Sequence, residues 1–119
     1  MNSTIYNFAI ARKLMIEQNE KNCERIIDNL INDLKKTIYL YTISKVYGIE
    51  KAQRYAANRL GLLKRNILVY KKILLILQLD KDNTQFILNN QYDEKQFDAY
   101  LKRASKREKN INKILEGLQ

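Results

Sequence analysis

The sequence predicts an all-α protein, and three observations support that prediction. Proline is absent from the 119 residues and glycine occurs only three times, so the chain has few residues suited to the tight turns that join β-strands. Apolar residues recur at spacings of three and four through most of the chain. Between Lys64 and Leu79 they lie on nearly every side of the expected helix, which must then be covered from several directions. We therefore predict one domain at residues 1–119, a compact bundle of three to four helices with a long, largely buried central helix.

The first helix is expected to start near Ser3, whose hydroxyl can cap it, and to run to about Tyr47. Its apolar period is clear from Cys23 onward, after a polar run at residues 17–22. We favour one long helix over a break at that run. Gly48 then supplies the residue type that most often ends a helix in the left-handed conformation.

The second helix is expected from about Ile49 to Leu79 and is the predicted centre of the bundle. The residues that follow it, 80–83, form a polar connector, and a short helical piece containing Phe86 is expected next. Two asparagines, Asn89 and Asn90, end that piece.

The last helix is expected to start at Asp93, because Asp93 and Gln96 have the spacing of a capping box. Its apolar positions, such as Phe97 and Ile111, fall on one face, and Gly117 marks its expected end.

The charge of the chain favours a polyanionic partner. The net charge is +9 and the pI is near 9.7, and basic surfaces attract nucleic acid first and anionic membranes second. The stretch at residues 48–79 holds seven bases and the single acid Glu50. Most of the excess charge therefore belongs to the second helix.

Two sets of bases are the candidate nucleic-acid-binding residues. On the last helix, four lysines project within about 60 degrees of one another, opposite the apolar face, with an arginine on either flank. On the second helix, two lysines and two arginines share the face away from the expected core, namely Lys51, Arg54, Arg65 and Lys72. Each set has a second interpretation, as a solvated face or as long stems that cover apolar surface while their heads reach water. The predicted residues are Lys51, Arg54, Arg65, Lys102, Arg103, Lys106, Arg107, Lys109 and Lys113.

Four tyrosines, Tyr39, Tyr41, Tyr47 and Tyr55, crowd the junction between the first two helices. Aromatic rings among bases can stack on unpaired nucleotides, and tyrosines at a helical hairpin can equally be packing residues. A helix-turn-helix with its turn at Gly48 is a weaker interpretation, because the helix that follows is about twice the usual length of a recognition helix.

The composition argues against catalysis and metal binding. Histidine is absent and Cys23 is the only cysteine, so a disulfide within the chain is excluded and a zinc site is disfavoured. Without histidine the chain lacks the common general base near neutral pH. We therefore predict no enzyme activity, no catalytic residue, no cofactor and no metal. One cysteine, the absence of a recognisable signal peptide and the absence of an apolar run long enough to span a bilayer favour the cytoplasm.

These observations predict a non-catalytic nucleic-acid-binding protein that contacts phosphates through its Lys and Arg stripes, with the size and charge of a small subunit of a nucleoprotein assembly. The alternative is a helical adaptor or structural protein that acts through homo- or hetero-oligomerisation, using the surplus apolar residues Leu62, Val69 and Ile76. Attachment to an anionic membrane is disfavoured for want of a free apolar face. The sequence does not determine whether the bound nucleic acid is DNA or RNA, or whether it is single- or double-stranded.

Overall fold

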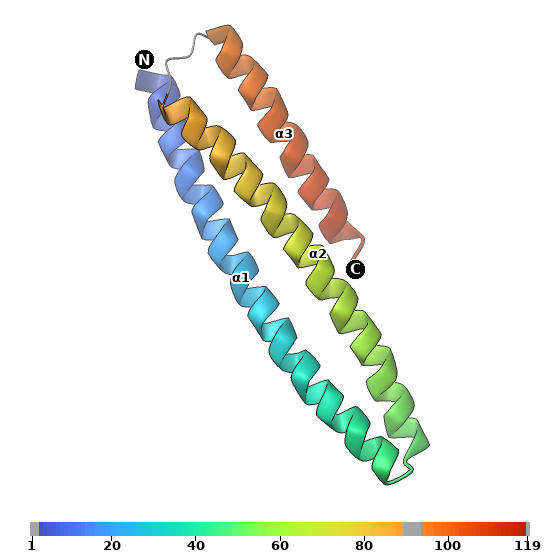
Figure 1. Ribbon diagram of the computed structural model, residues 1–119. Coiled ribbons are helices and arrows are strands. Elements are labelled where there is room, and N and C mark those ends of the chain that lie inside the picture. Colours follow the sequence, from blue (N-terminus) through green and yellow to red (C-terminus); the bar gives the residue numbers. More distant parts are fainter. Residues whose placement is uncertain (1–2, 90–93, 119) are drawn as a thin grey trace.

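The computed structural model describes residues 3–89 and 94–118, and the regular elements in these ranges are three α-helices: α1 (Ser3–Val46), α2 (Glu50–Asn89) and α3 (Glu94–Glu116). Helices α1 and α2 form an antiparallel hairpin along their whole length. Helix α3 lies beside the half of the hairpin that holds the N-terminus and ends beside its middle (Figure 1). The all-α prediction is confirmed, with three helices.

The molecule is a rod, so the prediction of a compact bundle is wrong in shape. Its principal extents are 67 × 20 × 14 Å and its radius of gyration is 20.2 Å. A compact chain of this length has a radius of gyration of about 13.5 Å. Helix α1 has 44 residues, which at a rise of about 1.5 Å per residue span roughly 66 Å. The uninterrupted length of α1 therefore sets the length of the molecule.

The predicted connector at residues 80–83 is wrong, because α2 continues through it to Asn89. The Thr84 hydroxyl donates to the carbonyl of Asp80 at 2.8 Å, and the Asn83 amide donates to the carbonyl of Leu79 at 2.9 Å. The Asp80 carboxylate is buried and paired with two arginines. Polar side chains that favour a break in an isolated chain are satisfied here within the fold, so the expected short piece is the last part of α2.

The turn between α1 and α2 forms as predicted around Gly48. Gly48 has φ of 67°, which is costly for any residue with a Cβ atom. The amide of Ile49 donates to the carbonyl of Ser44 at 2.9 Å, and the amide of Gly48 donates to the carbonyl of Lys45 at 3.3 Å. This pair of hydrogen bonds is the Schellman motif, which satisfies the last carbonyls of α1 and reverses the chain.

At the start of α3, the predicted capping residue Asp93 lies outside the described residues. At its end, the amide of Gly117 donates to the carbonyl of Lys113 at 3.2 Å, and the amide of Leu118 donates to the carbonyl of Leu115 at 3.1 Å. The last helix therefore ends at Gly117, as its glycine predicted.

Two hydrophobic clusters hold the three helices together. The first surrounds Ile16 and Ile73 and receives Ile111 and Leu115 from α3. The second surrounds Ile87 and is completed by further α3 residues. Neither cluster contains a residue between 32 and 68. We call residues 32–68 the open end and the remainder of the described chain the covered half.

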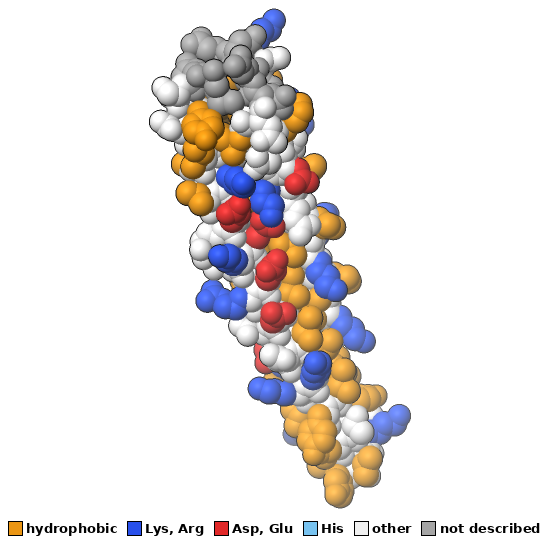
Figure 2. Space-filling view, turned by 60° about the vertical axis from the view of Figure 1, so that its left-hand side comes forward, with side chains coloured by type: hydrophobic (Ala, Val, Ile, Leu, Met, Phe, Trp, Pro, Cys, Tyr) orange, Lys and Arg blue, Asp and Glu red, His pale blue; other side chains and the backbone are white. Residues whose placement is uncertain are grey.

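The open end has small residues inside and large apolar residues outside. Three of its five buried side chains are small, Thr37, Ser44 and Ala56, and the two hydroxyls bond to carbonyls of their own helix. Figure 2 shows hydrophobic side chains gathered at the tip of this end. Its exposed large hydrophobic residues are Ile38, Tyr39, Leu40, Val46, Tyr47, Ile49, Tyr55, Leu62 and Leu68.

The predicted central helix is therefore covered along only part of its length. Val69 packs against the first cluster beside α3, whereas Leu62, seven residues earlier on the same side, is exposed beyond the end of α3. On the outer face of α2, Leu68, Leu75 and Leu79 are also exposed. Two neighbouring helices cannot enclose a helix that is apolar on all sides.

Candidate nucleic-acid interface

A row of five exposed lysines follows the outer side of α3. These residues lie opposite Tyr100 and Ala104, which α3 buries against the hairpin. None of the five makes an ion pair with a described residue. At about 1.5 Å per residue the row is roughly 27 Å long. We call it the outer row, and its members are Lys95, Lys102, Lys106, Lys109 and Lys113.

The sequence analysis missed Lys95. It lies seven residues before Lys102 and therefore on the same side of the helix, but Asp98 nearby made that stretch look mixed in charge. Counting by sevens from Lys102 would have found it. Arg103 is exposed at the flank of the outer row, as predicted.

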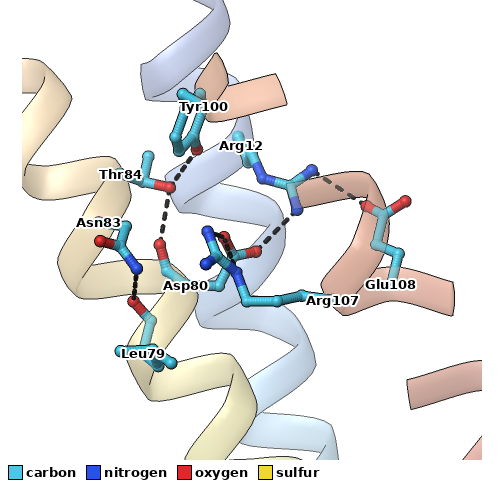
Figure 3. Close-up of polar contacts among 8 residues, drawn as sticks. All are labelled: Arg12, Leu79, Asp80, Asn83, Thr84, Tyr100, Arg107 and Glu108. Atoms are coloured by element: carbon cyan, nitrogen blue, oxygen red, sulfur yellow. Dashed lines mark hydrogen bonds and ion pairs between the residues drawn. The ribbon is translucent and has the colours of Figure 1, made fainter. Parts of the chain in front are cut away.

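Arg107, a predicted phosphate ligand, is instead bound within the fold. Its Nε and Nη2 donate to Asp80 Oδ1 at 3.2 and 2.9 Å. Arg12 of α1 donates from Nη2 to Asp80 Oδ2 at 2.7 Å and from Nη1 to Glu108 Oε1 at 3.0 Å. Figure 3 shows these four side chains, which come from all three helices: both arginines reach Asp80, and Glu108 binds the far side of Arg12. We call them the ionic lock.

The ionic lock is mostly buried, and its charges compensate one another. Burial lowers the pKa of the Arg12 guanidinium, but its hydrogen bonds to Asp80 and Glu108 outweigh burial and raise that pKa above its ordinary value. The lock thus holds Arg12 charged. The Nε and Nη2 donors of Arg107 are both bound to Asp80 and are not free for a phosphate.

The spacing of buried residues on α2 would have found the lock. Asp80 lies seven residues after Ile73 and seven before Ile87, and both isoleucines are buried. An acid at such a position needs a buried basic partner. Arg12, which is not among the predicted residues, is such a partner, together with Arg107.

The predicted bases of α2 form a second line, which the fold divides. Arg65 and Lys72 lie four residues before and three after Val69, so they flank the part of α2 on which α3 ends. Lys51 and Arg54 are exposed but belong to the open end, with Arg54 about 16 Å along the helix from Arg65. Arg65 therefore lies on the part of α2 beside which α3 ends, whereas Lys51 and Arg54 lie in the open end.

Acidic residues gather on a different face. On α1 they lie at spacings of three and four and so share one side of the helix, and Figure 2 shows acidic side chains along the middle of that face. Glu20 binds Lys81 of α2 at 2.9 Å, and this hydrogen bond raises the pKa of Lys81. The acidic face consists of Glu17, Glu20, Glu24 and Asp28. Helix α1 also carries seven bases, so its charges are mixed, and two of these acids make ion pairs, whereas the lysines of the outer row make none with a described residue.

Of the four tyrosines at the junction, Tyr39, Tyr47 and Tyr55 are exposed and Tyr41 is half-buried. Tyr41 lines a shallow pocket of about 330 Å³ with Arg54 and residues of the α2 start. The three exposed rings are accessible to a partner of either kind, a nucleotide base or another protein surface.

A cleft of about 420 Å³ runs between α1 and α3, with α2 as its floor. Its lining is mostly apolar, and the ionic lock closes one end. Cys23 lies in this cleft, where its thiol donates to the carbonyl of Tyr70 at 3.2 Å and burial raises the thiol pKa. A thiol that keeps its proton is a poor nucleophile, so the cleft offers no reactive group of that kind.

Within residues 3–89 and 94–118, no group of three or more Cys, Asp or Glu side chains is arranged to hold a metal ion. The same residues contain no helix that is both long and apolar enough to cross a bilayer. Comparisons with protein-family models, with curated proteins and with solved structures found no match to this chain.

Proposed function

We propose that this protein is a non-catalytic nucleic-acid-binding protein of the cytoplasm that grips a phosphate backbone with the outer row. The observation that carries the proposal is the set of five exposed lysines that have no acidic partner among the described residues. Like charges at spacings of three and four on a helix repel one another, and a bound polyanion removes that repulsion. Arg107 is left out of the binding set, because the ionic lock occupies it.

The unpaired charge of the outer row supports a defined orientation on the nucleic acid. The five acids of α1 offset much of the attraction that its seven bases exert on phosphates, whereas the outer row makes no ion pair with a described residue, so the rod is expected to lie with α3 against the backbone. Arg65 and Lys72 extend the contact at the end of α3. Lysines bind phosphates as point charges without reading bases, so we expect weak dependence on sequence.

Fluorescence anisotropy with labelled single- and double-stranded oligonucleotides tests this proposal. If the five lysines neutralise five phosphates, log K for a duplex should fall with log salt at a slope of about −4.5. The variant Lys102→Gln, Lys106→Gln, Lys109→Gln should reduce the size of that slope by about 3, since each lost phosphate contact removes about one.

The matched control removes three exposed bases from α1 instead, Lys21→Gln, Arg25→Gln and Lys35→Gln. It changes the net charge by the same amount and should leave the slope nearly intact. Equal reductions of the slope in both variants would mean that binding depends only on the net charge of the protein. That result would refute a site on α3. Undetectable binding at low salt would refute the function.

An adaptor function, acting through association with protein, is the second candidate. It is favoured by the inverted arrangement of the open end, where large apolar side chains face outward.

A further inference from the structure

The groove that receives α3 continues into the open end. Residues spaced by seven along two helices that coil about each other lie on one side of the pair. Two such rows border the groove: Ile26, Asp33, Leu40 and Tyr47 on α1, and Tyr55, Leu62, Val69 and Ile76 on α2. Ile26 lines the cleft between α1 and α3, and Val69 packs against the cluster that holds the end of α3. The two rows therefore extend the side of the hairpin that binds α3 past the end of α3 and into the open end.

Four side chains of these rows lie uncovered in the open end, and we call them the open seam. Leu40 is 50% exposed, Tyr47 74%, Tyr55 63% and Leu62 46%. An aromatic side chain offers about 150–250 Å² of surface, so the two tyrosines alone expose roughly 270 Å², and the two leucines enlarge a patch that is still smaller than the about 800 Å² that each partner buries in a standard interface. The largest exposed apolar patch of a typical monomeric protein is about 300–600 Å² and often serves a function, so the open seam has the size of a binding surface.

We propose that the open seam binds a second copy of this chain, with the two open ends side by side and antiparallel about a two-fold axis. Helix α3 blocks the groove at one end, which limits an occupant there to the length of the open end. The open end of a second copy has that same length, so it can cover the open seam from the end of α3 to the tip. In this arrangement each tip, with its exposed Val46 and Tyr47, also meets the end of α3 in the other copy.

The four helices of the two open ends then form a bundle that encloses the open seam from both sides. Small buried residues already let α1 and α2 approach closely, and the large outward side chains supply the core between the copies. An interface of this kind resembles a protein core divided between two chains, as obligate homodimer interfaces do.

The charge of the open end sets the salt dependence of this association. It holds eight bases and two acids, and one acid is used within the chain, since Asp33 pairs with Arg59 at 4.0 Å. The copies therefore repel one another through exposed charges, and salt screens that repulsion without weakening apolar burial. Dimerisation should strengthen as salt rises, whereas nucleic-acid binding should weaken. The inference is thus independent of the proposed function and fails separately from it.

Light scattering coupled to size-exclusion chromatography, over a series of protein concentrations, tests the inference. The expected mass is twice the chain mass of 14.2 kDa. The fraction of protein in the dimer should stay the same or rise at high salt. The double variant Leu40→Glu, Leu62→Glu should be monomeric at every concentration with unchanged helical content by circular dichroism. If that variant loses helix, the milder Tyr55→Ser should raise the dimer dissociation constant at least tenfold.

Leu68→Glu is the matched control. Leu68 is six residues after Leu62, which turns it about 120 degrees away from the seam, and it is more exposed, at 68%. It should remain dimeric. A monomeric wild-type protein at all concentrations would overturn the inference, as would dissociation of the Leu68→Glu variant equal to that of the seam variant. Masses that grow beyond a dimer would indicate head-to-tail assembly and overturn it as well.

Discussion

The covered half and the open end are built from the same two helices, yet they are stabilised differently. In the covered half, α3 closes two hydrophobic clusters and the ionic lock ties the three helices at Asp80. In the open end the helices touch through small side chains, and the large apolar ones face outward. The difference shows that an apolar stripe on a helix becomes core only where a further helix reaches it. Three experiments would break or sharpen this comparison.

The largest effect is expected at the ionic lock. Asp80→Ala should cost about 3–5 kcal/mol of unfolding free energy, because it leaves the mostly buried Arg12 and Arg107 guanidiniums without a counter-ion. Urea denaturation followed by circular dichroism measures this. Asp82→Ala, an exposed acid two residues away on α2, is the control and should stay within about 0.5 kcal/mol of the wild type. Similar losses of unfolding free energy in both variants would mean that the ionic lock stabilises the fold no more than an exposed acid does.

A pair of isoleucines on α1 compares the two regions directly. Ile16, in the first cluster, is 1% exposed, and Ile38, in the open end, is 47% exposed. Ile16→Ala should cost about 2–5 kcal/mol, since it leaves a cavity, whereas Ile38→Ala should cost less than about 1 kcal/mol. The same denaturation experiment, made at low protein concentration, gives both values. A cost at Ile38 equal to that at Ile16 would contradict the description of the open end as coreless.

The smallest effect is a loss of stability in alkali. Burial raises the pKa of the Tyr100 hydroxyl above its ordinary value of 10.0, although its hydrogen bond with Thr84 and the nearby Arg12 oppose the shift. The folded state keeps this proton longer than the unfolded state does. The stability it contributes is therefore complete below about pH 10 and is lost as pH rises through the folded-state pKa.

Absorbance of tyrosinate followed against pH should show a late-ionising component in the wild type that is missing in Tyr100→Phe. Denaturation midpoints should fall less steeply above pH 10 in that variant than in the wild type. An unchanged titration curve in Tyr100→Phe would place the late component on another tyrosine.

The sequence predicts most of the binding surface proposed here, the outer row. Four of the five lysines of the outer row could be identified from their spacing on a helix, because an outward face depends on periodicity alone. Arg107 could not be excluded in the same way. Its partner Asp80 lies 27 residues away in sequence, and Arg12, which shares that carboxylate, lies 95 residues away, so no local pattern connects them.

The sequence by itself determined the helices, the left-handed turn at Gly48 and the end of α3, because these depend on the period of apolar residues and on local backbone preference. The tertiary structure decided whether Asp80 breaks α2 or continues it, since only the arginines of two other helices make a buried carboxylate tolerable there. It also decided which apolar residues are core. Periodicity gives the direction of Leu62 and Val69 alike, but only the position at which α3 ends determines that one is exposed and the other covered.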